Sequence, residues 1–445
     1  MNKFLYQIVN VFLIFSLLFF ISDFVSAQEA SLTKKRDLSM PGDFPDRIIL
    51  HPTVNPLESL AVNWRTSVDQ PKGKVEWAEA THGAEFMEFR KVEDAASSFL
   101  SVRHETNPTV EAYYHAAVIS DLIAGKTYVY RVGSEDYWSE WYQFTVSSPD
   151  AKPLTFLYLG DAQNGIKNHW SRLFRAAYAQ NPAIDFVIHA GDLINRHNND
   201  LEWGEWFNAG DYIHATVPTI ATPGNHEYGK DEELSPQWRP QFNLPVNGPK
   251  GLEETCYQIN YPNLKVISLN AEEIEESAHL KELQLKWLED ILQNDPKQWT
   301  VLTLHHPFYS TKENRDNEDL RKHFKPILDK YKVDLVLQGH DHAYGRGMIG
   351  PNQNGGMKEV KAIQEGGTVY VVSMAGLKMY DAQKFPWMER KASDTQMYQL
   401  VEIMGDKLKF KAYTVTGKLY DAFELDKNKS GSNKLINQIP DSPAY

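Results

Sequence analysis

A single cysteine, Cys256, occurs among the 445 residues, so no disulfide bond can form within the chain. Stability must therefore come from buried apolar cores, with bound metal as a further contribution. Cys256 lies in an alternating apolar and polar pattern, and no histidine and asparagine set is placed to activate it. We therefore predict that Cys256 is a buried strand residue rather than a catalytic nucleophile.

Basic residues are also scarce relative to acidic ones. The chain has 46 lysines and arginines against 59 aspartates and glutamates, a formal net charge of −13. Nucleic acid and anionic membranes bind basic surfaces, so this balance argues against both as partners. A small phosphate ester remains a compatible partner, because bound cations reverse the local field. No pattern in the sequence points to a particular oligomeric state.

Long apolar runs are confined to the N-terminus. Lys3 precedes an apolar stretch from Val9 to Ile21, and Val25-Ser26-Ala27 has the small-residue pattern of a cleavage site. We expect residues 1–27 to be a signal peptide and the protein to be exported, either periplasmic or secreted. A retained anchor is the alternative, but the run is shorter than the ~20 residues of a spanning helix. No later run is long enough to span, so no stable membrane insertion is expected after cleavage.

Residues 28–44 are polar and non-periodic and are predicted to be a linker. Over residues 45–147 apolar and polar residues alternate, as at Leu60-Ala61-Val62-Asn63-Trp64, which predicts strands. The segment Leu122–Tyr128 places a leucine, a turn glycine and a tyrosine as in the tyrosine corner of immunoglobulin-like sandwiches. We therefore expect a fibronectin type III-like β-sandwich.

Residues 153–427 follow a different pattern, in which apolar runs of strand length alternate with helical stretches. Leu154–Leu159 and Ile184–Ala190 are such runs, whereas Leu280–Leu292 repeats apolar residues at helical spacing. This alternation predicts an α/β layered domain with two stacked sheets flanked by helices. Residues 428–445 are polar and are predicted to be a loose tail.

Residues of the types that bind metals occur where the apolar runs end: Asp161, Asp192, Asn225, His305, His340 and His342. In α/β sheets, ligand sites gather at the carboxyl ends of strands. Oxygen and imidazole ligands without thiolate suit Zn²⁺, Mn²⁺ or iron. Two carboxylates, one amide and three imidazoles exceed the needs of one tetrahedral ion. They suit two divalent ions about 3.5–4 Å apart, an arrangement used for phosphate ester hydrolysis.

The ordered motifs resemble those of the purple acid phosphatases, a branch of the calcineurin-like metallophosphoesterase superfamily. The resemblance covers roughly residues 45–425 and includes the sandwich that precedes the α/β domain. It also includes Gln284-Leu285-Lys286-Trp287-Leu288, His306-Pro307-Phe308-Tyr309-Ser310 and Gly339-His340-Asp341-His342-Ala343-Tyr344, and the ordered set is specific to the superfamily. It implies a secreted acid phosphatase-like enzyme.

The resemblance also implies a role for each site residue. Asp161 and His342 would bind the first ion, Asp192 would bridge both ions, and Asn225, His305 and His340 would complete the second site. A metal-bridging hydroxide would attack a phosphomonoester, while His226 stabilises the phosphoryl oxygens or protonates the leaving group. Asp192 and His226 are therefore the expected catalytic residues. A phosphodiesterase on the same metal core, or a catalytically weak surface-binding protein, are the alternatives.

The sequence departs from the family pattern at the first metal. Gln163 ends Asp161-Ala162-Gln163, where the family has Asp-x-Gly, and Asn195 stands where the family has a tyrosinate ligand. We expect the amide oxygen of Gln163 or Asn195 to supply the missing ligand. Arg315 lies where the plant enzymes carry a histidine pair. Arg315 and Arg346 are candidates for bidentate phosphate binding, with a solvated surface arginine as the alternative for each.

Overall fold

The structure is a computed structural model that describes residues 38–104, 108–149, 152–443 and 445, and the residues from Ser39 onward form one compact unit. The predicted signal peptide and most of the predicted linker lie outside these residues. Among the helices that the structure describes, none is long and apolar enough to cross a membrane.

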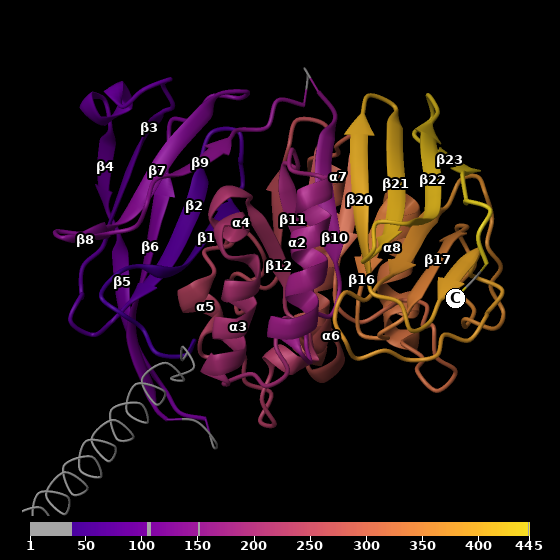
Figure 1. The fold of residues 1–445 in the computed structure, drawn as a ribbon. Coiled ribbons are helices and arrows are strands. Elements are labelled where there is room, and N and C mark those ends of the chain that lie inside the picture. Colours follow the sequence, from indigo (N-terminus) through magenta and orange to yellow (C-terminus); the bar gives the residue numbers. More distant parts are fainter. Residues whose placement is uncertain (1–37, 105–107, 150–151, 444) are drawn as a thin grey trace, which may run out of the picture. The chain divides into compact units, whose positions relative to one another are not determined.

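The described part of residues 38–149 folds into two antiparallel sheets, at the left of Figure 1. The first sheet has the order β1 (Asp46–Pro52), β2 (Leu60–Thr66), β6 (Val110–Ile119), β5 (Ala96–Val102). The second has the order β4 (Lys91–Asp94), β3 (Lys74–Glu79), β7 (Thr127–Ser134), β8 (Tyr137–Trp138), with β9 (Tyr142–Thr145) also paired to β7 and the 3-10 helix η1 (Glu85–Glu88) between β3 and β4. Apolar side chains of both sheets share one core, which confirms the predicted sandwich.

The tyrosine-corner contact that the sequence predicts is present. The Tyr128 hydroxyl accepts a hydrogen bond from the backbone N–H of Ile123 at 3.1 Å. Tyr128 itself is buried in the sandwich core. The bond fixes the loop that enters β7, as in immunoglobulin-like sandwiches.

Residues 152–443 contain two seven-stranded sheets. The first has the order β12 (Thr219–Thr222), β11 (Phe186–Ala190), β10 (Leu154–Leu159), β20 (Met397–Met404), β21 (Lys407–Thr414), β22 (Leu419–Lys427), β23 (Asn433–Asn437). The second has the order β13 (Tyr257–Asn260), β14 (Leu264–Ser268), β15 (Trp299–Thr303), β16 (Leu335–Gln338), β18 (Thr368–Val372), β17 (Tyr344–Ile349), β19 (Arg390–Ala392). Apolar side chains from both sheets form one large core between them.

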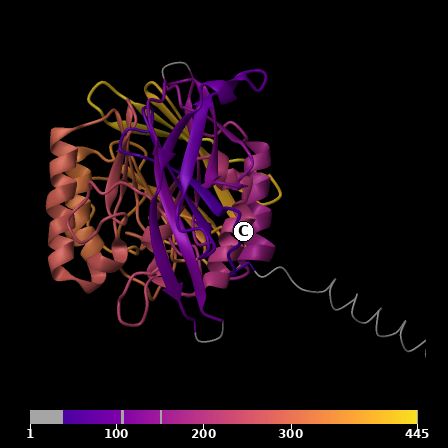
Figure 2. The same cartoon turned by 90° about the vertical axis from the view of Figure 1, so that its left-hand side faces the viewer.

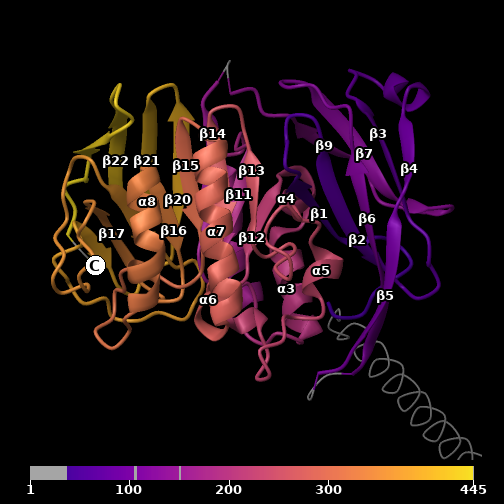
Figure 3. The same ribbon diagram turned by 180° about the vertical axis from the view of Figure 1, so that it is seen from behind.

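Helices lie on the outer faces of both sheets, as Figures 1 and 3 show from opposite sides and Figure 2 shows edge-on, but none of the described helices lies in front of β21 and β22 in Figure 1, and β21 alternates more exposed with buried residues. The elements on the side of the first sheet are η2 (a π-helix, Ile166–Trp170), α2 (Ser171–Gln180), α3 (Asp200–Gly210) and α4 (Tyr212–Thr216). Those on the side of the second sheet are α6 (Ala271–Glu276), α7 (Ala278–Asn294), η4 (a π-helix, Leu320–Phe324) and α8 (Lys325–Tyr331). The short helices η3 (3-10, Asn225–Glu227) and α5 (Trp238–Gln241) lie in connecting segments. This arrangement confirms the predicted α/β layered class.

Parallel pairing of the central strands explains why their sequences are unbroken apolar runs and why their carboxyl ends lie together. β10, β11 and β12 pair in parallel, as do β14, β15, β16 and β18, and every residue of β11, β15 and β16 is buried. Strands covered on both faces carry apolar side chains throughout. Parallel neighbours also bring their carboxyl ends to one edge of a sheet, so the loops that follow them meet there.

The prediction of a loose C-terminal tail is wrong for part of that segment. Residues 433–437 form β23, which pairs antiparallel with β22. Leu435 is buried against the first sheet, and the Asn433 side chain donates to the carboxylate of Asp334 at 2.6 Å. The free edge of β22 offers these polar residues backbone partners, which local composition does not reveal.

Buried polar contacts join the sandwich to the α/β domain. The Arg47 and Arg65 guanidinium groups lie 2.6 Å and 3.0 Å from the Asp200 carboxylate at the start of α3. The Tyr130 hydroxyl donates to the Ala215 carbonyl at 2.6 Å. Because these groups are withdrawn from solvent, the sandwich is held firmly rather than loosely tethered.

Candidate metal centre

The six predicted ligand residues follow five strands of the two sheets. Asp161 follows β10, Asp192 follows β11 and Asn225 follows β12, all in the first sheet. In the second sheet His305 follows β15, while His340 and His342 follow β16. Both sheets therefore present their carboxyl ends to one region, and the structure brings all six residues together.

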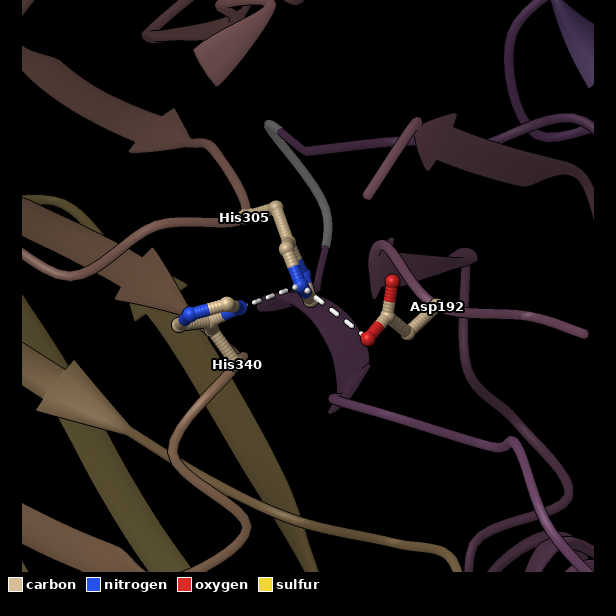
Figure 4. A group of neighbouring side chains, drawn as sticks. All are labelled: Asp192, His305 and His340. Atoms are coloured by element: carbon tan, nitrogen blue, oxygen red, sulfur yellow. Dashed lines mark hydrogen bonds and ion pairs between the residues drawn. The ribbon is translucent and has the colours of Figure 1, made fainter. Parts of the chain in front are cut away.

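Two groups of ligand atoms share Asp192. Possible ligand atoms of Asp161, Asp192 and His342 lie within 4.8 Å of one another, and so do those of Asp192, His305 and His340. Figure 4 shows the second group, in which His305 Nε2 lies 3.2 Å from an Asp192 carboxylate oxygen and 3.2 Å from His340 Nδ1. Asn225 joins this group, with Oδ1 3.0 Å from His340 Nδ1. A carboxylate common to two adjacent groups is what a bridged pair of ions requires.

Backbone carbonyls orient two of the imidazoles. His305 Nδ1 lies 2.8 Å from the Ala190 carbonyl, and His342 Nδ1 lies 2.8 Å from the Lys378 carbonyl. A carbonyl only accepts, so each Nδ1 carries the proton. Nε2 of each ring then turns its lone pair toward the centre, as metal-binding histidines do.

Four ligand residues have the left-handed backbone conformation: Asp161 (φ 41°), Asp192 (φ 52°), His340 (φ 72°) and His342 (φ 50°). For residues other than glycine this conformation costs about 1–3 kcal/mol each, and it concentrates at functional sites. Gly339 allows the turns to pack closely, because a Cβ there would lie 2.6 Å from an Asp161 carboxylate oxygen. The strand ends are thus bent sharply so that the side chains face the centre.

The electrostatics of the centre call for added positive charge. Burial, reinforced by the charge of Asp192, raises the pKa of Asp161 to about 8. Burial would also raise the pKa of Asp192, but the positive charge of a protonated His305 imidazole, which a metal ion at Nε2 would replace, holds this pKa well below its usual range. Two buried carboxylates this close remain anionic together only with a compensating cation. The donor set, oxygens and imidazoles without thiolate, therefore fits two divalent metal ions.

Of the two residues expected to replace the missing ligand, Gln163 lies in the first group. Its Nε2 donates to the Asp192 carboxylate at 2.6 Å and lies 3.2 Å from His342 Nε2. If the oxygen and nitrogen of the Gln163 side-chain amide are exchanged, Oε1 takes the position of Nε2 and faces the first group of ligand atoms. Asn195 contacts the site through its backbone instead, because its carbonyl accepts from His226 Nδ1 at 2.7 Å.

His226 lies at the rim of the centre. Its backbone N–H donates to the Asp192 carboxylate at 3.0 Å, and its Nε2 lies 4.0 Å from the same group. The His226 side chain is 26% exposed, whereas that of Asp192 is 1% exposed. His226 can therefore meet a substrate that approaches from solvent while remaining fixed beside a metal ligand.

The two candidate arginines differ sharply. Arg315 lies beside the centre and donates to the His340 carbonyl at 2.7 Å, with its side chain partly exposed. Arg346 is fully buried and pairs with Asp421 at 2.7 Å, with Glu389 and with Asn437. The prediction that Arg346 binds substrate is wrong, because these partners occupy its guanidinium.

Sequence reasoning missed several residues that surround the centre: Glu227, Lys312, Lys378 and Tyr380. Glu227 stands next to His226, and its position in Gly224-Asn225-His226-Glu227 is a signal that could have pointed to it. Tyr380 packs against His342, with ring centroids 4.9 Å apart, and no local pattern marks it. Cys256 is buried and burial raises its pKa well above the usual range, in line with the prediction that it is not a nucleophile.

Comparisons with known proteins agree with this geometry. Residues 115–344 match the calcineurin-like phosphoesterase family, and residues 45–146 match the purple acid phosphatase N-terminal domain. The Fe(3+)-Zn(2+) purple acid phosphatase 12 of Arabidopsis thaliana is 30% identical over 53% of this chain and 52% of its own length. Acid phosphatase type 7 of Mus musculus is 26% identical over 53% of this chain and 57% of its own length. The alignments thus span little more than half of each relative.

Solved structures share the fold. A purple acid phosphatase from yellow lupin (Lupinus luteus) seeds superposes with a TM-score of 0.69 at 19% identity, covering 87% of this chain and 75% of the lupin chain. A structure of PhoD superposes with a TM-score of 0.64 at 15% identity, covering 90% of this chain and 93% of that one. The match over residues 115–344 shows that the chain belongs to the calcineurin-like phosphoesterase family, and its N-terminal domain matches that of the purple acid phosphatases.

Proposed function

We propose that this protein is an exported, metal-dependent phosphatase that hydrolyses phosphomonoesters. The observation that carries the proposal is the Asp192 carboxylate, which belongs to two adjacent groups of ligand atoms. Asp161, His342 and Gln163 would hold one divalent ion, while Asn225, His305 and His340 would hold the other. When bound, the pair would supply positive charge for the phosphoryl oxygens and would lower the pKa of a water molecule.

His226 would act on the substrate directly. Its Nδ1–H is held by the Asn195 carbonyl, so Nε2 is the nitrogen that faces the centre. When protonated, Nε2 would donate to a phosphoryl oxygen or to the oxygen of the departing alcohol. The carbonyl also fixes the ring, so the proton is delivered from one direction.

Hydrolysis and metal content together test this function. The purified protein is loaded with Zn²⁺, Mn²⁺ or Fe²⁺ and assayed on an aryl phosphomonoester and on the corresponding diester. We expect about two ions per chain and faster turnover of the monoester. The Asp192→Ala variant should lose both hydrolysis and metal, because neither group keeps its shared oxygen. Near-wild-type activity in that variant would sink the assignment.

Two alternatives give different results in the same assay. Faster turnover of the diester would identify a phosphodiesterase on the same centre. Bound metal without turnover of either ester would point to a surface-binding protein. Export is tested separately by N-terminal sequencing of the mature protein, which should begin at Gln28.

A further inference from the structure

Three cationic side chains surround the ring of Tyr380, and together these four residues are called the Tyr380 cluster. Lys312 Nζ lies 3.6 Å from the ring centroid, Lys378 Nζ lies 5.6 Å from it, and the Arg315 guanidinium lies 5.8 Å from it. These separations are within the range of cation–π attraction. The ring thus gathers three positive charges at one place on a chain whose formal net charge is −13.

The cluster is built onto the ligands of both proposed ions. The Lys378 carbonyl fixes His342 Nδ1 at 2.8 Å, and the Tyr380 backbone N–H donates to the His342 carbonyl at 2.9 Å. Arg315 donates to the His340 carbonyl at 2.7 Å. These contacts hold the cationic groups at the border of the metal centre, where the part of a substrate beyond the transferred phosphoryl group would lie.

The two lysines keep their charge available. Within the described residues neither Lys312 nor Lys378 has an ion pair within 4.0 Å, and both are half-buried. Arg315 has a carboxylate partner, Asp341, at 3.4 Å. Lys312 and Arg315 also line a surface hollow of about 240 Å³, whose rim includes the acidic Glu313 and Asp381. Glu313 is already paired with Lys358, and within the described residues the Asp381 carboxylate forms no ion pair within 4.0 Å with either lysine.

We propose that the Tyr380 cluster binds a second phosphate group carried by the leaving group of the substrate. This inference rests on the proposed function, and it narrows the substrate class to phosphomonoesters that contain a further phosphate. A neutral alcohol would leave the two ammonium groups without a partner, whereas a phosphate accepts hydrogen bonds from lysine and arginine together. The reaction is the same hydrolysis: water adds its oxygen to phosphorus, the ester P–O bond breaks, and the departing alcohol takes a proton.

The test compares propanediol monophosphate with propanediol bisphosphate, two esters whose leaving alcohols differ only by the second phosphate. We expect wild-type kcat/KM to be about tenfold higher for the bisphosphate, after allowance for its two equivalent ends, which corresponds to ~1.4 kcal/mol. The double variant Lys312→Gln, Lys378→Gln should lose this preference, because its kcat/KM for the bisphosphate should fall about tenfold more than its kcat/KM for the monophosphate. Added salt should also lower the wild-type preference, because exposed charges are screened.

A matched control carries Lys286→Gln and Lys330→Gln, which remove two exposed lysines from α7 and α8. It should keep the preference of the wild type, and thermal unfolding of both double variants should match that of the wild type. An equal preference in wild type and in the Lys312, Lys378 variant would overturn the proposal. So would an absence of any preference in an active wild-type enzyme.

Measurements of phosphonate binding test the role of the Tyr380 cluster independently of the proposed phosphatase activity. Affinities of the non-hydrolysable propane monophosphonate and bisphosphonate are measured by calorimetry with the metal-loaded wild type and both double variants. In one outcome the wild type hydrolyses neither ester yet binds the bisphosphonate about tenfold more tightly than the monophosphonate, and the difference is lost in the Lys312, Lys378 variant. That result would support the role of the cluster and contradict the proposed phosphatase activity. Equal affinity for the two phosphonates in all three proteins would overturn the cluster, whatever the turnover.

Discussion

The carboxylate of Glu227 accepts the backbone N–H of Asp192 at 2.9 Å and so joins the loop after β12 to the loop after β11. The same carboxylate accepts the backbone N–H groups of Gly224 at 2.7 Å and of Leu193 at 2.8 Å. Glu227 is fully buried, and burial together with the charge of Asp192 raises its pKa to about 8. Glu227 therefore positions Asp192 from a buried place behind the centre rather than from its exposed rim.

We predict that Glu227→Gln lowers metal affinity by about 10–100-fold. An amide has one acceptor oxygen, and its NH₂ group would face backbone N–H donors, so the two loops would separate. Metal dissociation constants from competition with a chelator measure the effect. Glu282→Gln, on the exposed face of α7, is the control and should bind metal normally. Unchanged affinity in Glu227→Gln would show that the loops hold their positions without this carboxylate.

For His226→Ala we expect turnover to fall by about 10²–10⁴-fold while most metal stays bound. The reason is that His226 lies at the exposed rim and the ligand side chains do not depend on its ring. The loss should be smaller for esters with very good leaving groups if His226 acts as an acid. His279→Ala, on α7, serves as the control. Metal loss in step with activity would instead make His226 a ligand.

The iron-loaded protein should be colourless. In the purple acid phosphatases that the sequence resembles, the colour comes from charge transfer between a tyrosinate and ferric iron, and the resemblance aligns Asn195 with that tyrosine. The Tyr228 hydroxyl contacts Asn270 at 2.6 Å and the Tyr344 hydroxyl contacts Asp421 at 2.7 Å, so both are engaged elsewhere. Losing a negative ligand also favours divalent over trivalent ions, because attraction scales with the product of charges.

Visible absorption spectra of the protein loaded with ferric iron check this prediction. Activity should return with divalent ions after chelation. A strong band that disappears in Tyr380→Phe would identify the tyrosine packed against His342 as a ligand. A band that persists in that variant and in Tyr228→Phe and Tyr344→Phe would contradict the alignment of Asn195 with the family's tyrosine.

Removing Asp200 should destabilise the whole protein. Arg47 and Arg65 both pair with this carboxylate, and their side chains are at most 4% exposed. Removing one partner of a buried ion pair costs ~3–5 kcal/mol, and we expect the lower end of this range because Arg65 keeps its pair with Asp46 at 2.7 Å and Arg47 keeps its hydrogen bond to Gln241 at 2.8 Å. Urea unfolding of Asp200→Ala measures the loss. The control Asp94→Ala breaks an exposed pair with Lys74 and should cost less than ~1 kcal/mol.

In the metal-free protein three buried histidines should each contribute stability that is lost below pH 6.5, against the opposite contribution of Asp161 and Glu227, whose raised pKa values favour protonation in the folded state. Burial lowers the pKa of His51 and His115 from 6.5 to about 4 and that of His189 from 6.5 to about 3. The unfolded chain binds these protons near pH 6.5, but the folded chain does so only at lower pH. The stabilisation is therefore complete above pH 6.5 and is lost as pH falls toward 4, by ~1.4 kcal/mol per pH unit for each histidine.

Chemical unfolding between pH 6 and pH 4.5 tests the sign and the size of this dependence. His189 contacts Trp170, Phe174 and Trp206, so His189→Phe replaces one ring by another in an aromatic cluster. This variant should reduce the slope by ~1.4 kcal/mol per pH unit. A slope identical to that of the wild type would show that His189 does not resist protonation in the folded state.

The ligands of the centre could be predicted from local sequence alone. Each stands within a few residues of the end of an apolar run, and four of the six, Asp161, Asp192, Asn225 and His340, follow a glycine directly. Strand periodicity and the chemical type of a side chain are local properties, so both can be recognised in the sequence without knowledge of the fold. The layered α/β class is predicted from the alternation of strand-length and helical segments in residues 153–427. The preceding sandwich is predicted from the alternation of apolar and polar residues in residues 45–147.

Only the tertiary structure distinguished Arg315 from Arg346, which the sequence analysis leaves as equal candidates for phosphate binding. Arg346 is neutralised by Asp421, 75 positions away in the chain, whereas Arg315 reaches the backbone of His340. Likewise the Tyr380 cluster and the edge strand β23 depend on partners that the sheets bring together over long separations. Burial and ion pairing are set by such distant partners, and a periodic pattern carries no information about which segments will meet.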